Sequence, residues 1–384
     1  MSNNYDVIVI GAGSVGVPTA LLLSQKKLRV LVIDKNSSPG QGQNKKAIGG
    51  IRATHSDKGK ILTSLRSIEF FSTWQDKYGD DIDWMSNGYS FPAYNEQDEK
   101  MLKDLLEIQQ SFGLNIKWIS AEEYQKLVPG INPDGLRGST YSPEDGSASP
   151  FKAINAFYFK SIDFGCEYKF DEQVISIGIE HNKVKSVSTD KGKYFCDYIV
   201  NAGGNNAKDI GLMIGIDIPV KPDSHEAAIT ERVKPFFKPM VVDMRPATGS
   251  KNYYFYQSKR GQIVFCITPE PPFYGTDSRS TSVFLPQVAK RMIELFPRLK
   301  NIKVRRTWRG QYPMSPDGFP IVGELKEVKG FINAVGMCGQ GFMLGPGIGN
   351  LITRIITNNL TKDDNDILYN FSLYRDFSGT EKFK

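Results

Sequence analysis

The stretch "DVIVIGAGSVGVPTALLLSQKKLRVLVIDK", residues 6–35, decides the fold of this chain. Residues 6–10 are a short β-branched run that suits a buried parallel strand, and residues 29–34 form a second such run. Between them, a turn with three glycines precedes a segment with helical spacing. A strand, a glycine turn, a helix and a strand in this order are typical of a dinucleotide-binding unit.

Each glycine of the turn has a predicted role. Gly11 permits a tight turn, Gly13 lets the backbone approach a pyrophosphate, and Gly16 lets helix and strand pack closely. The helix start stabilises phosphate charge, and Asp34 is expected to accept hydrogen bonds from a ribose hydroxyl. The binding candidates here are Gly11, Ala12, Gly13, Ser14, Val15, Gly16, Asp34 and Lys35. The motif alone does not distinguish FAD from NAD.

A second glycine-rich segment, "GFINAVGMCGQGFMLGPGIGNLITRII", covers residues 330–356. A strand over 331–335 meets a glycine turn, and a later set of glycines is expected to lead into a helix. The turn glycines are Gly336, Gly339 and Gly341, and the later set is Gly345, Gly347 and Gly349. Such backbone can approach a flat or anionic group at a helix start. The alternative is a glycine-rich loop that packs on the first helix.

A further strand, "YIVNAGG" (198–204), follows a hairpin pattern over residues 174–195. A nucleotide site would thus draw on the first, middle and last thirds of the chain. This disfavours a simple NAD dehydrogenase, in which the nucleotide domain is usually contiguous.

Bulk composition excludes several other classes. The chain has 384 residues and a formal charge of +6, and its basic residues form no long run, so no nucleic-acid partner is predicted. No segment approaches the roughly 18 apolar residues of a membrane span, and no signal peptide is expected. The four cysteines are widely spaced and there are three histidines, so neither a disulfide framework nor a metal site is predicted. The chain is expected to be cytoplasmic, with attachment at a membrane surface left open.

Five motifs together resemble the glycine oxidase, sarcosine oxidase and D-amino-acid oxidase family of flavoenzymes. They are "VIVIGAGSVG", "GGIRATHS", "YIVNAGG", "PMSPDGFPIVG" and "GQGFMLGPGIG". The resemblance covers nearly the whole chain and is greatest to the beta subunits of sarcosine oxidase and of dye-linked proline or hydroxyproline dehydrogenases.

The resemblance implies an α/β fold with two domains. A Rossmann-type FAD-binding domain would comprise residues 1–85, 145–220 and 305–384. An α+β substrate domain on a large, mostly antiparallel sheet would comprise 86–144 and 221–304. The sequence pattern agrees in part with this substrate domain, because residues 225–267 contain alternating or aromatic runs typical of strands. Residues 96–113 read as an amphipathic helix that ends at Gly113.

The family oxidises a small amino acid or N-alkyl amino acid at the carbon next to nitrogen. A hydride passes to N5 of a bound FAD, and the resulting imine is hydrolysed. Such a site needs a cation for the substrate carboxylate, and Arg52 in "GGIRATHS" is the first candidate. His55 is a secondary candidate, and Tyr254 and Tyr256 share one face of a predicted strand, where they would line the pocket. The alternatives are a surface arginine, a structural histidine and an ordinary aromatic strand face.

The remaining cofactor candidates follow from the same motifs. The backbone after the last strand is expected to donate hydrogen bonds to the flavin ring, beside a favourable helix start. The candidates are Gly49, Gly50, Ile51, Val174, Ala202, Gly203, Gly310, Gly339, Gln340, Gly341, Phe342 and Met343.

Three departures separate this chain from the monomeric sarcosine oxidases that it resembles. Gly310 stands where those enzymes hold FAD through a cysteine, so FAD is expected to be non-covalent. The stretch "GQIVFCIT" has no lysine where they carry one that promotes reaction with oxygen, and Phe265 is the nearest equivalent. Met343 replaces a lysine that helps to bind the substrate carboxylate.

These departures favour a dehydrogenase that passes electrons to a partner subunit or a quinone-like or dye acceptor. Three alternatives stay open: an oxidase that makes hydrogen peroxide, a 2-hydroxy acid dehydrogenase with His55 or His225 as proton acceptor, and a non-catalytic flavin-binding subunit. The sequence does not indicate the oligomeric state.

Overall fold

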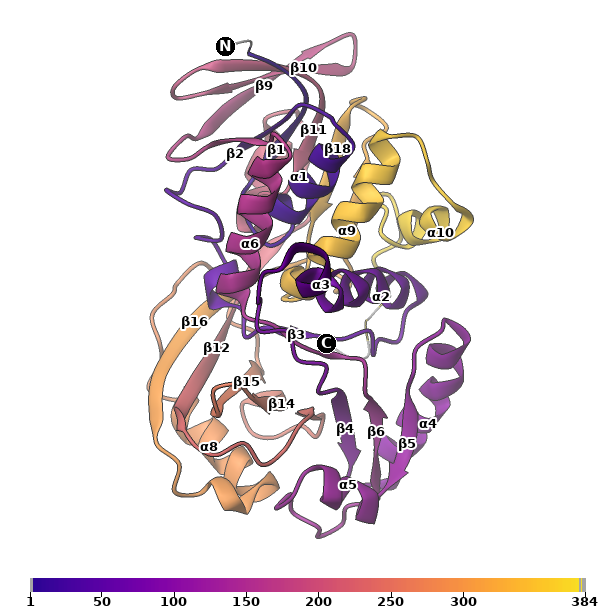
Figure 1. Ribbon diagram of the computed structural model, residues 1–384, viewed down its shortest axis with the longest axis vertical. Coiled ribbons are helices and arrows are strands. Elements are labelled where there is room, and N and C mark those ends of the chain that lie inside the picture. Colours follow the sequence, from indigo (N-terminus) through magenta and orange to yellow (C-terminus); the bar gives the residue numbers. More distant parts are fainter. Residues whose placement is uncertain (1–2, 380, 382–384) are drawn as a thin grey trace.

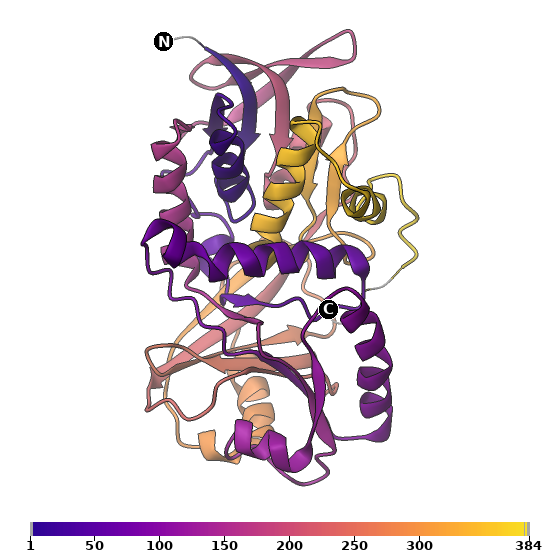
Figure 2. The same cartoon turned by 45° about the vertical axis from the view of Figure 1, so that its right-hand side comes forward.

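The computed structural model describes residues 3–379 and residue 381. Its elements form two halves stacked along the long axis, each built around one large sheet (Figure 1). Helix α2 (Lys58–Ser72) runs across the molecule between the two halves (Figure 2). The space between the two sheets is therefore bounded by segments from distant parts of the sequence.

The first sheet contains the predicted dinucleotide-binding unit. Its main path is β17 (Ile321–Glu324), β18 (Phe331–Val335), β11 (Lys193–Asn201), β1 (Asn4–Ile10), β2 (Val30–Ile33) and β8 (Glu167–Lys169). The strands from β18 to β8 are parallel. The central residues of β18, β1 and β2 and the end of β11 are buried, as expected for a sheet covered on both faces, whereas the edge strand β8 is partly exposed. The predicted hairpin is present as β9 (Val174–Glu180) and β10 (Lys183–Thr189), which extend the sheet from β11.

Helices pack on this sheet and on one another. They are α1 (Gly16–Gln25), α3 (Trp74–Tyr78), α6 (Pro150–Asp163), α7 (Ala207–Leu212), α9 (Gly341–Ile356) and α10 (Lys362–Asn370). Helix α1 contacts both α6 and α9, and α9 also packs on α2. These contacts place the starts of α1 and α9 side by side.

The predicted start of the last long helix was wrong. Gly345, Gly347 and Gly349 do not precede α9 but lie inside it, because the helix already begins at Gly341. A Cβ on Gly345 would lie 1.9 Å from the carbonyl oxygen of Ser14, and one on Gly347 would meet the α2 backbone at 2.1 Å. These glycines allow α9 to pack closely on α1 and α2 as a helix, whereas the alternative from the sequence was a glycine-rich loop on the first helix.

The second sheet is mostly antiparallel. Its order is β16 (Val304–Met314), β12 (Lys221–Arg232), β15 (Gln262–Pro269), β14 (Ser250–Gln257), β13 (Met240–Asp243), β4 (Tyr89–Ala93), β6 (Gly138–Ser142) and β5 (Lys117–Ser120). Only the pairing of β13 with β4 is parallel. Helices α4 (Glu96–Ser111), α5 (Ala121–Leu127) and α8 (Phe284–Leu295) pack around it. Helix α4 matches the predicted amphipathic helix, and Gly113 after it has a φ of +85°.

The two faces of the second sheet have different surroundings. Val241, Phe255 and Phe265 pack with α8 in a hydrophobic core, whereas their neighbours along the strands face the first half. The position assigned to Phe265 is therefore corrected: its side chain points away from the first half, and Cys266 occupies the facing position. The reason is the two-residue period of a strand, which places adjacent residues on opposite faces.

One strand lies differently from the predicted division into domains. Residues 304–314 form β16, which pairs with β12 from Val304 to Met314 and so belongs to the second sheet by its hydrogen bonds. The predicted division placed residue 305 onward in the FAD-binding domain. The short strands β3 (Gly50–Ile51) and β7 (Gly146–Ser147) pair separately, between the two halves.

Candidate cofactor and substrate site

The turn after β1 has the geometry that its glycines predict. Gly11 has a φ of +110°, and a Cβ there would lie 2.5 Å from the carbonyl oxygen of Ala202. A Cβ on Gly16 would lie 1.8 Å from the carbonyl oxygen of Gly11, so this glycine permits contact between helix and turn. At Gly13 the same position has no atom within 4 Å. The backbone at Gly13 is therefore open to a ligand at the start of α1.

Asp34 follows β2 and organises the same turn. Its Oδ2 accepts a hydrogen bond from the backbone N–H of Ala12 at 2.7 Å, and its Oδ1 accepts one from Asn36 N–H at 2.8 Å. Asp34 and Lys35 both line the large cavity described next, and Lys35 Nζ donates to Asn206 Oδ1 at 3.1 Å. The carboxylate is thus fixed at the end of the strand where a ribose would lie.

A cavity of about 1800 Å³ extends from this turn into the space between the two sheets. Pockets for single small ligands usually have volumes of roughly 300–1,000 Å³, so this cavity has room for a dinucleotide and a small substrate together. The predicted residues that line it are Gly11, Gly13, Ser14, Val15, Asp34, Lys35, Gly49, Gly50, Arg52, Val174, Ala202, Gly203, Tyr254, Gly310, Gly339, Gln340, Gly341, Phe342 and Met343. Residues from all three thirds of the chain therefore meet at one cavity.

Five predicted site residues do not line the cavity: Ala12, Gly16, Ile51, His55 and Tyr256. Ala12 and Gly16 shape the turn through the contacts given above. Ile51 is fully buried in the short strand β3, where it precedes Arg52.

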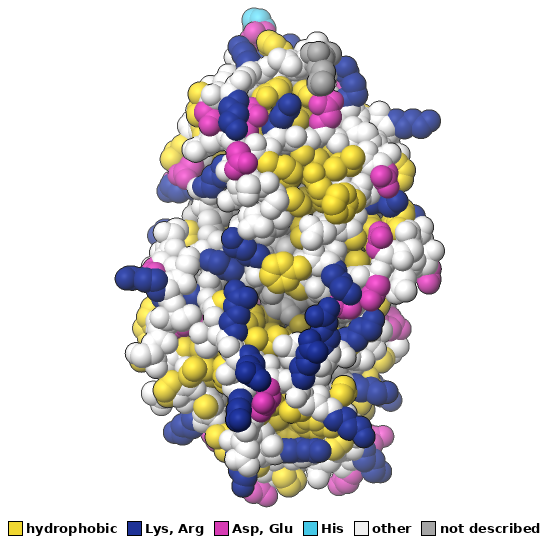
Figure 3. Space-filling model, turned by 60° about the vertical axis from the view of Figure 1, so that its left-hand side comes forward, with side chains coloured by type: hydrophobic (Ala, Val, Ile, Leu, Met, Phe, Trp, Pro, Cys, Tyr) yellow, Lys and Arg dark blue, Asp and Glu magenta, His cyan; other side chains and the backbone are white. Residues whose placement is uncertain are grey.

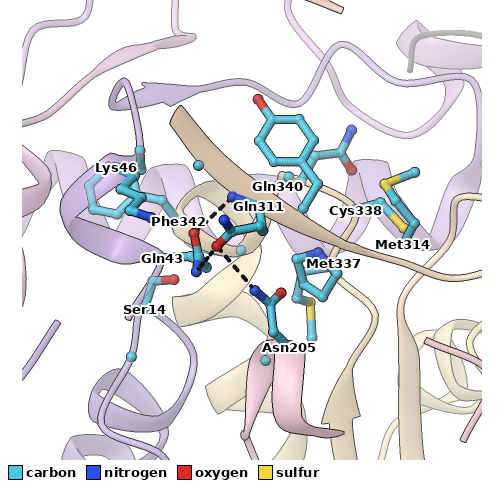
Figure 4. Close-up of a pocket in the computed structure, with 18 of the residues that line it drawn as sticks. Ser14, Gln43, Lys46, Asn205, Gln311, Met314, Met337, Cys338, Gln340 and Phe342 are labelled. Atoms are coloured by element: carbon cyan, nitrogen blue, oxygen red, sulfur yellow. Dashed lines mark hydrogen bonds between the residues drawn. The ribbon is translucent and has the colours of Figure 1, made fainter. Parts of the chain in front are cut away.

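The segment before α9 forms a second part of the cavity wall, beside the turn at α1 (Figure 4). Cys338 and Gly339 have φ values of +50° and +83°, and a Cβ on Gly339 would lie 2.3 Å from the ring of Tyr312. Gln340 Oε1 is buried and has no hydrogen-bond partner among the described residues. Together with the open position at Gly13, this buried acceptor fits a cavity shaped for a polar, flat cofactor.

A cluster of polar side chains that the sequence reasoning did not predict also lines the cavity. Gln43 and Gln311 exchange hydrogen bonds, at 2.6 Å from Gln43 Nε2 and 2.8 Å from the Gln311 backbone N–H (Figure 4). Asn205 joins them at 3.5 Å, and Lys46 lies alongside, where burial lowers the pKa of its ammonium group. Gln43 and Lys46 lie in the stretch "GQGQNKK" (residues 40–46), which matches no known motif, so only the tertiary contacts reveal this cluster.

Arg52 is buried, with 8% of its surface exposed, and lines the cavity. Its Nη1 donates to the carbonyl oxygen of Thr54 and lies 3.2 Å from His55 Nδ1. Burial lowers the pKa of the guanidinium, and the charges of Glu381 and Asp145 oppose this shift. Because arginine stays protonated in proteins, the cavity has a fixed positive charge at this point.

His55 lies behind Arg52 and not in the cavity wall. It is fully buried, and burial together with the charge of Arg52 lowers the pKa of its imidazole far below the usual range. The ring is therefore neutral near pH 7 and supports the guanidinium as an acceptor.

Further buried charges surround Arg52. Lys60 and Glu381 form an ion pair at 3.3 Å with both side chains inaccessible to solvent, and Ser56 Oγ donates to Glu381 Oε1 at 2.6 Å. Asp145 accepts hydrogen bonds from Ala53 N–H at 2.8 Å and from the Thr54 hydroxyl at 2.6 Å. The sequence showed no motif for these residues, which lie far apart along the chain.

Asp145 is expected to make stability depend on pH. Burial raises the pKa of its carboxyl from 3.8 to about 6, so between these values the folded state holds a proton that the unfolded state releases. The free energy of unfolding should therefore fall as the pH rises through this window. At pH values above the window it should be about 3 kcal/mol lower than at pH values below it. Denaturant unfolding of the wild type and of Asp145→Asn at pH 4 and pH 7 measures the difference. Equal pH dependence in both proteins would contradict the prediction.

The two predicted tyrosines differ in their roles. Tyr254 lines the cavity, and its hydroxyl lies 3.0 Å from that of Tyr312. Tyr256 lies on the same face but outside the cavity, where its hydroxyl donates to the carbonyl oxygen of Ile48. The ring of Tyr312 stacks on His225 with 3.8 Å between centroids, and His225 also lines the cavity.

One face of the molecule carries a concentration of positive charge. On the face shown in Figure 3, Lys and Arg side chains gather over the lower half of the molecule, and hydrophobic side chains form a patch over the upper half. With the formal charge of +6, this distribution favours the approach of an anionic ligand. No helix among residues 3–379 is long and apolar enough to cross a lipid bilayer.

Fold and cavity together define a class. A glycine turn at α1, a second glycine segment at α9 and an antiparallel sheet facing the same cavity are features of dinucleotide-dependent oxidoreductases with an adjacent substrate site. A family model described as FAD dependent oxidoreductase matches residues 6–355, and the chain belongs to this family. The cofactor is therefore FAD, and the predicted fold class and family are confirmed.

Individual relatives agree with this assignment. The crystal structure of L-proline dehydrogenase from P. horikoshii has 31% sequence identity and a TM-score of 0.91, covering 98% of each chain. Sarcosine oxidase subunit beta of an Arthrobacter species is 22% identical over 93% of this chain and 88% of the relative. The structure of glycine oxidase from Geobacillus kaustophilus has 22% sequence identity to this chain and a TM-score of 0.85. The match covers 97% of this chain and 99% of the glycine oxidase chain, and it shows that the two share a fold.

Proposed function

We propose that this protein oxidises the C–N bond of a small amino acid or secondary amino acid of the sarcosine, proline, hydroxyproline or glycine type. The substrate would lose a hydride from the carbon next to nitrogen, and water would hydrolyse the resulting imine. Bound FAD supplies the hydride acceptor. The observation that carries the proposal is the buried Arg52 in the wall of the cavity that also includes Gly339–Met343.

The residues of the chain have distinct proposed roles. Arg52 binds the substrate carboxylate through its planar fork, and His55 holds the guanidinium in place as a neutral acceptor. The phenol pair of Tyr254 and Tyr312 orients the substrate from the opposite sheet. The glycines at positions 11, 13, 339 and 341 let backbone N–H groups approach the cofactor.

We further propose that FAD is bound without a covalent link and that electrons pass to an acceptor other than oxygen. Gly310, Met343 and Cys266 of β15 line the cavity. By the sequence resemblance, the monomeric oxidases carry a cysteine in place of Gly310 and a lysine in place of Met343, and the strand over the flavin has no lysine here. A relative named as a beta subunit makes a partner subunit one candidate acceptor. Release of the flavin into solution on acid precipitation is the expected result for non-covalent binding.

Anaerobic reduction of the flavin tests the reaction. The holoenzyme is mixed with D- and L-amino acids, sarcosine, proline and hydroxyproline without oxygen, and the loss of flavin absorbance is followed. Rapid bleaching by one of these compounds, followed by faster reoxidation with a dye than with air, supports the proposal. Slow bleaching by all of them would overturn it, and equal rates with air and dye would favour an oxidase.

One observation keeps a second candidate reaction open to test. His225 lines the cavity and its Nε2 lies 3.1 Å from Asp223 Oδ2, so a histidine with a fixed orientation is available as a proton acceptor. Oxidation of a 2-hydroxy acid would use such a base. Adding lactate and other 2-hydroxy acids to the same screen distinguishes the two reactions.

A further inference from the structure

The part of the cavity next to Arg52 has a strongly apolar wall. The residues that form it come from β4, from β13 and the position directly after it, and from α4. They are Tyr89, Phe91, Met240, Val242, Met244 and Met101. The same residues belong to one hydrophobic cluster, so they form a continuous surface.

The pairing of two strands explains how this wall forms beside the cation. Strand β13 runs parallel to β4 with Met240 opposite Tyr89, so residues of both strands face the cavity together. The guanidinium carbon of Arg52 lies 5.8 Å from the centroid of the Phe91 ring. A carboxylate held by Arg52 would therefore place its neighbouring carbon atoms against apolar side chains.

Two charged residues that line the cavity, Lys251 and Asp98, have polar partners. Lys251 forms an ion pair with Glu270 at 2.7 Å, and Asp98 Oδ2 accepts a hydrogen bond from Asn95 Nδ2 at 2.7 Å. The three methionines are unbranched and adaptable, so they can pack against side chains of different shapes.

Resting on the proposed function, we infer that the preferred substrate is an amino acid with an apolar side chain of three or more carbon atoms, straight or cyclic. Glycine and sarcosine would leave the wall without contacts. Burial of a methylene group against apolar surface strengthens binding about fourfold. Norvaline, with three more carbon atoms, is therefore expected to exceed glycine by about 60-fold in kcat/KM. Proline, with two more carbon atoms, is expected to exceed sarcosine by about 15-fold. Each pair keeps the amine class constant.

A binding experiment separates the apolar wall from the chemistry. The dissociation constants of acetate, propionate, butyrate, pentanoate and hexanoate for the oxidised holoenzyme are measured by calorimetry. The expected result is a fall of about fourfold for each added methylene until the wall is covered. A flat series, or tighter binding of acetate than of pentanoate, would overturn the inference.

Variants locate the effect at the wall. Val242→Thr keeps the shape of the side chain but adds a hydroxyl, and it should weaken pentanoate binding at least threefold while leaving acetate binding unchanged. Val283→Thr is the matched control, because Val283 is 49% exposed and lies outside the cavity. If Val242→Thr did not fold, Phe91→Leu would replace it, with the same expected change in the slope of the series.

The two proposals fail in different ways. A steep carboxylate series without flavin reduction by any amino acid would retain the apolar subsite and reject the proposed amine oxidation. Flavin reduction that is fastest with glycine or sarcosine would retain the amine oxidation and reject the apolar substrate class.

Discussion

Replacing Arg52 with methionine is expected to lower kcat/KM for the substrate by roughly 30- to 5,000-fold. This corresponds to about 2–5 kcal/mol, the usual cost of removing one partner of a buried charge pair. The arginine lies in the cavity wall with most of its surface buried, so no bulk water replaces the lost fork. The loss should appear equally in the affinity for simple carboxylates, because the substrate carboxylate is what the guanidinium would bind.

Two controls make the result interpretable. The FAD content and melting temperature of Arg52→Met report whether the buried partners Glu381 and Asp145 tolerate the loss of the charge. Arg52→Lys keeps the charge but not the planar fork, and should lie between the wild type and Arg52→Met. Unchanged carboxylate affinity in a variant that retains FAD would contradict the assignment of Arg52. Loss of FAD with intact carboxylate affinity would place it at the cofactor instead.

Valine substitutions at two glycines of the first turn are expected to impair different properties: FAD binding at Gly13 and folding at Gly16. Gly13→Val should fold but bind FAD at least tenfold more weakly, about 1.4 kcal/mol or more, because the space next to Gly13 is open in the protein and would be taken by the cofactor. Gly16→Val should not fold normally, since its Cβ would lie 1.8 Å from the carbonyl oxygen of Gly11. Titration with FAD and thermal unfolding of the apoproteins measure the two effects.

The control for this pair lies outside the cavity. Gly379 is exposed and a Cβ there also meets no atom within 4 Å, so Gly379→Val should change neither FAD affinity nor stability. A Gly13→Val protein with normal FAD affinity would show that the pyrophosphate does not approach this backbone. A stable Gly16→Val apoprotein would show that the contact between α1 and the turn is dispensable.

The sequence by itself determined the local elements around the glycine motifs and indicated a dinucleotide cofactor. The alternation of buried strand, glycine turn and helix over residues 6–35 is local, so it could be read without knowing what lies elsewhere in space. The structure contains the expected strands β1, β2, β11 and β18, the hairpin of β9 and β10, and helix α4. The resemblance carried by the glycine motifs extended this to FAD, which the comparisons confirm.

Only the tertiary structure decided which side chains meet. Tyr254 and Tyr256 share a strand face, yet one reaches the cavity and the other binds the Ile48 backbone, because the cavity covers only part of that face. His55 lies near Arg52 in sequence but behind it in space, whereas His225, from another sheet, lines the cavity. Strand period and motif spacing fix a side chain's direction along its own element. They do not fix what the remote elements place opposite it.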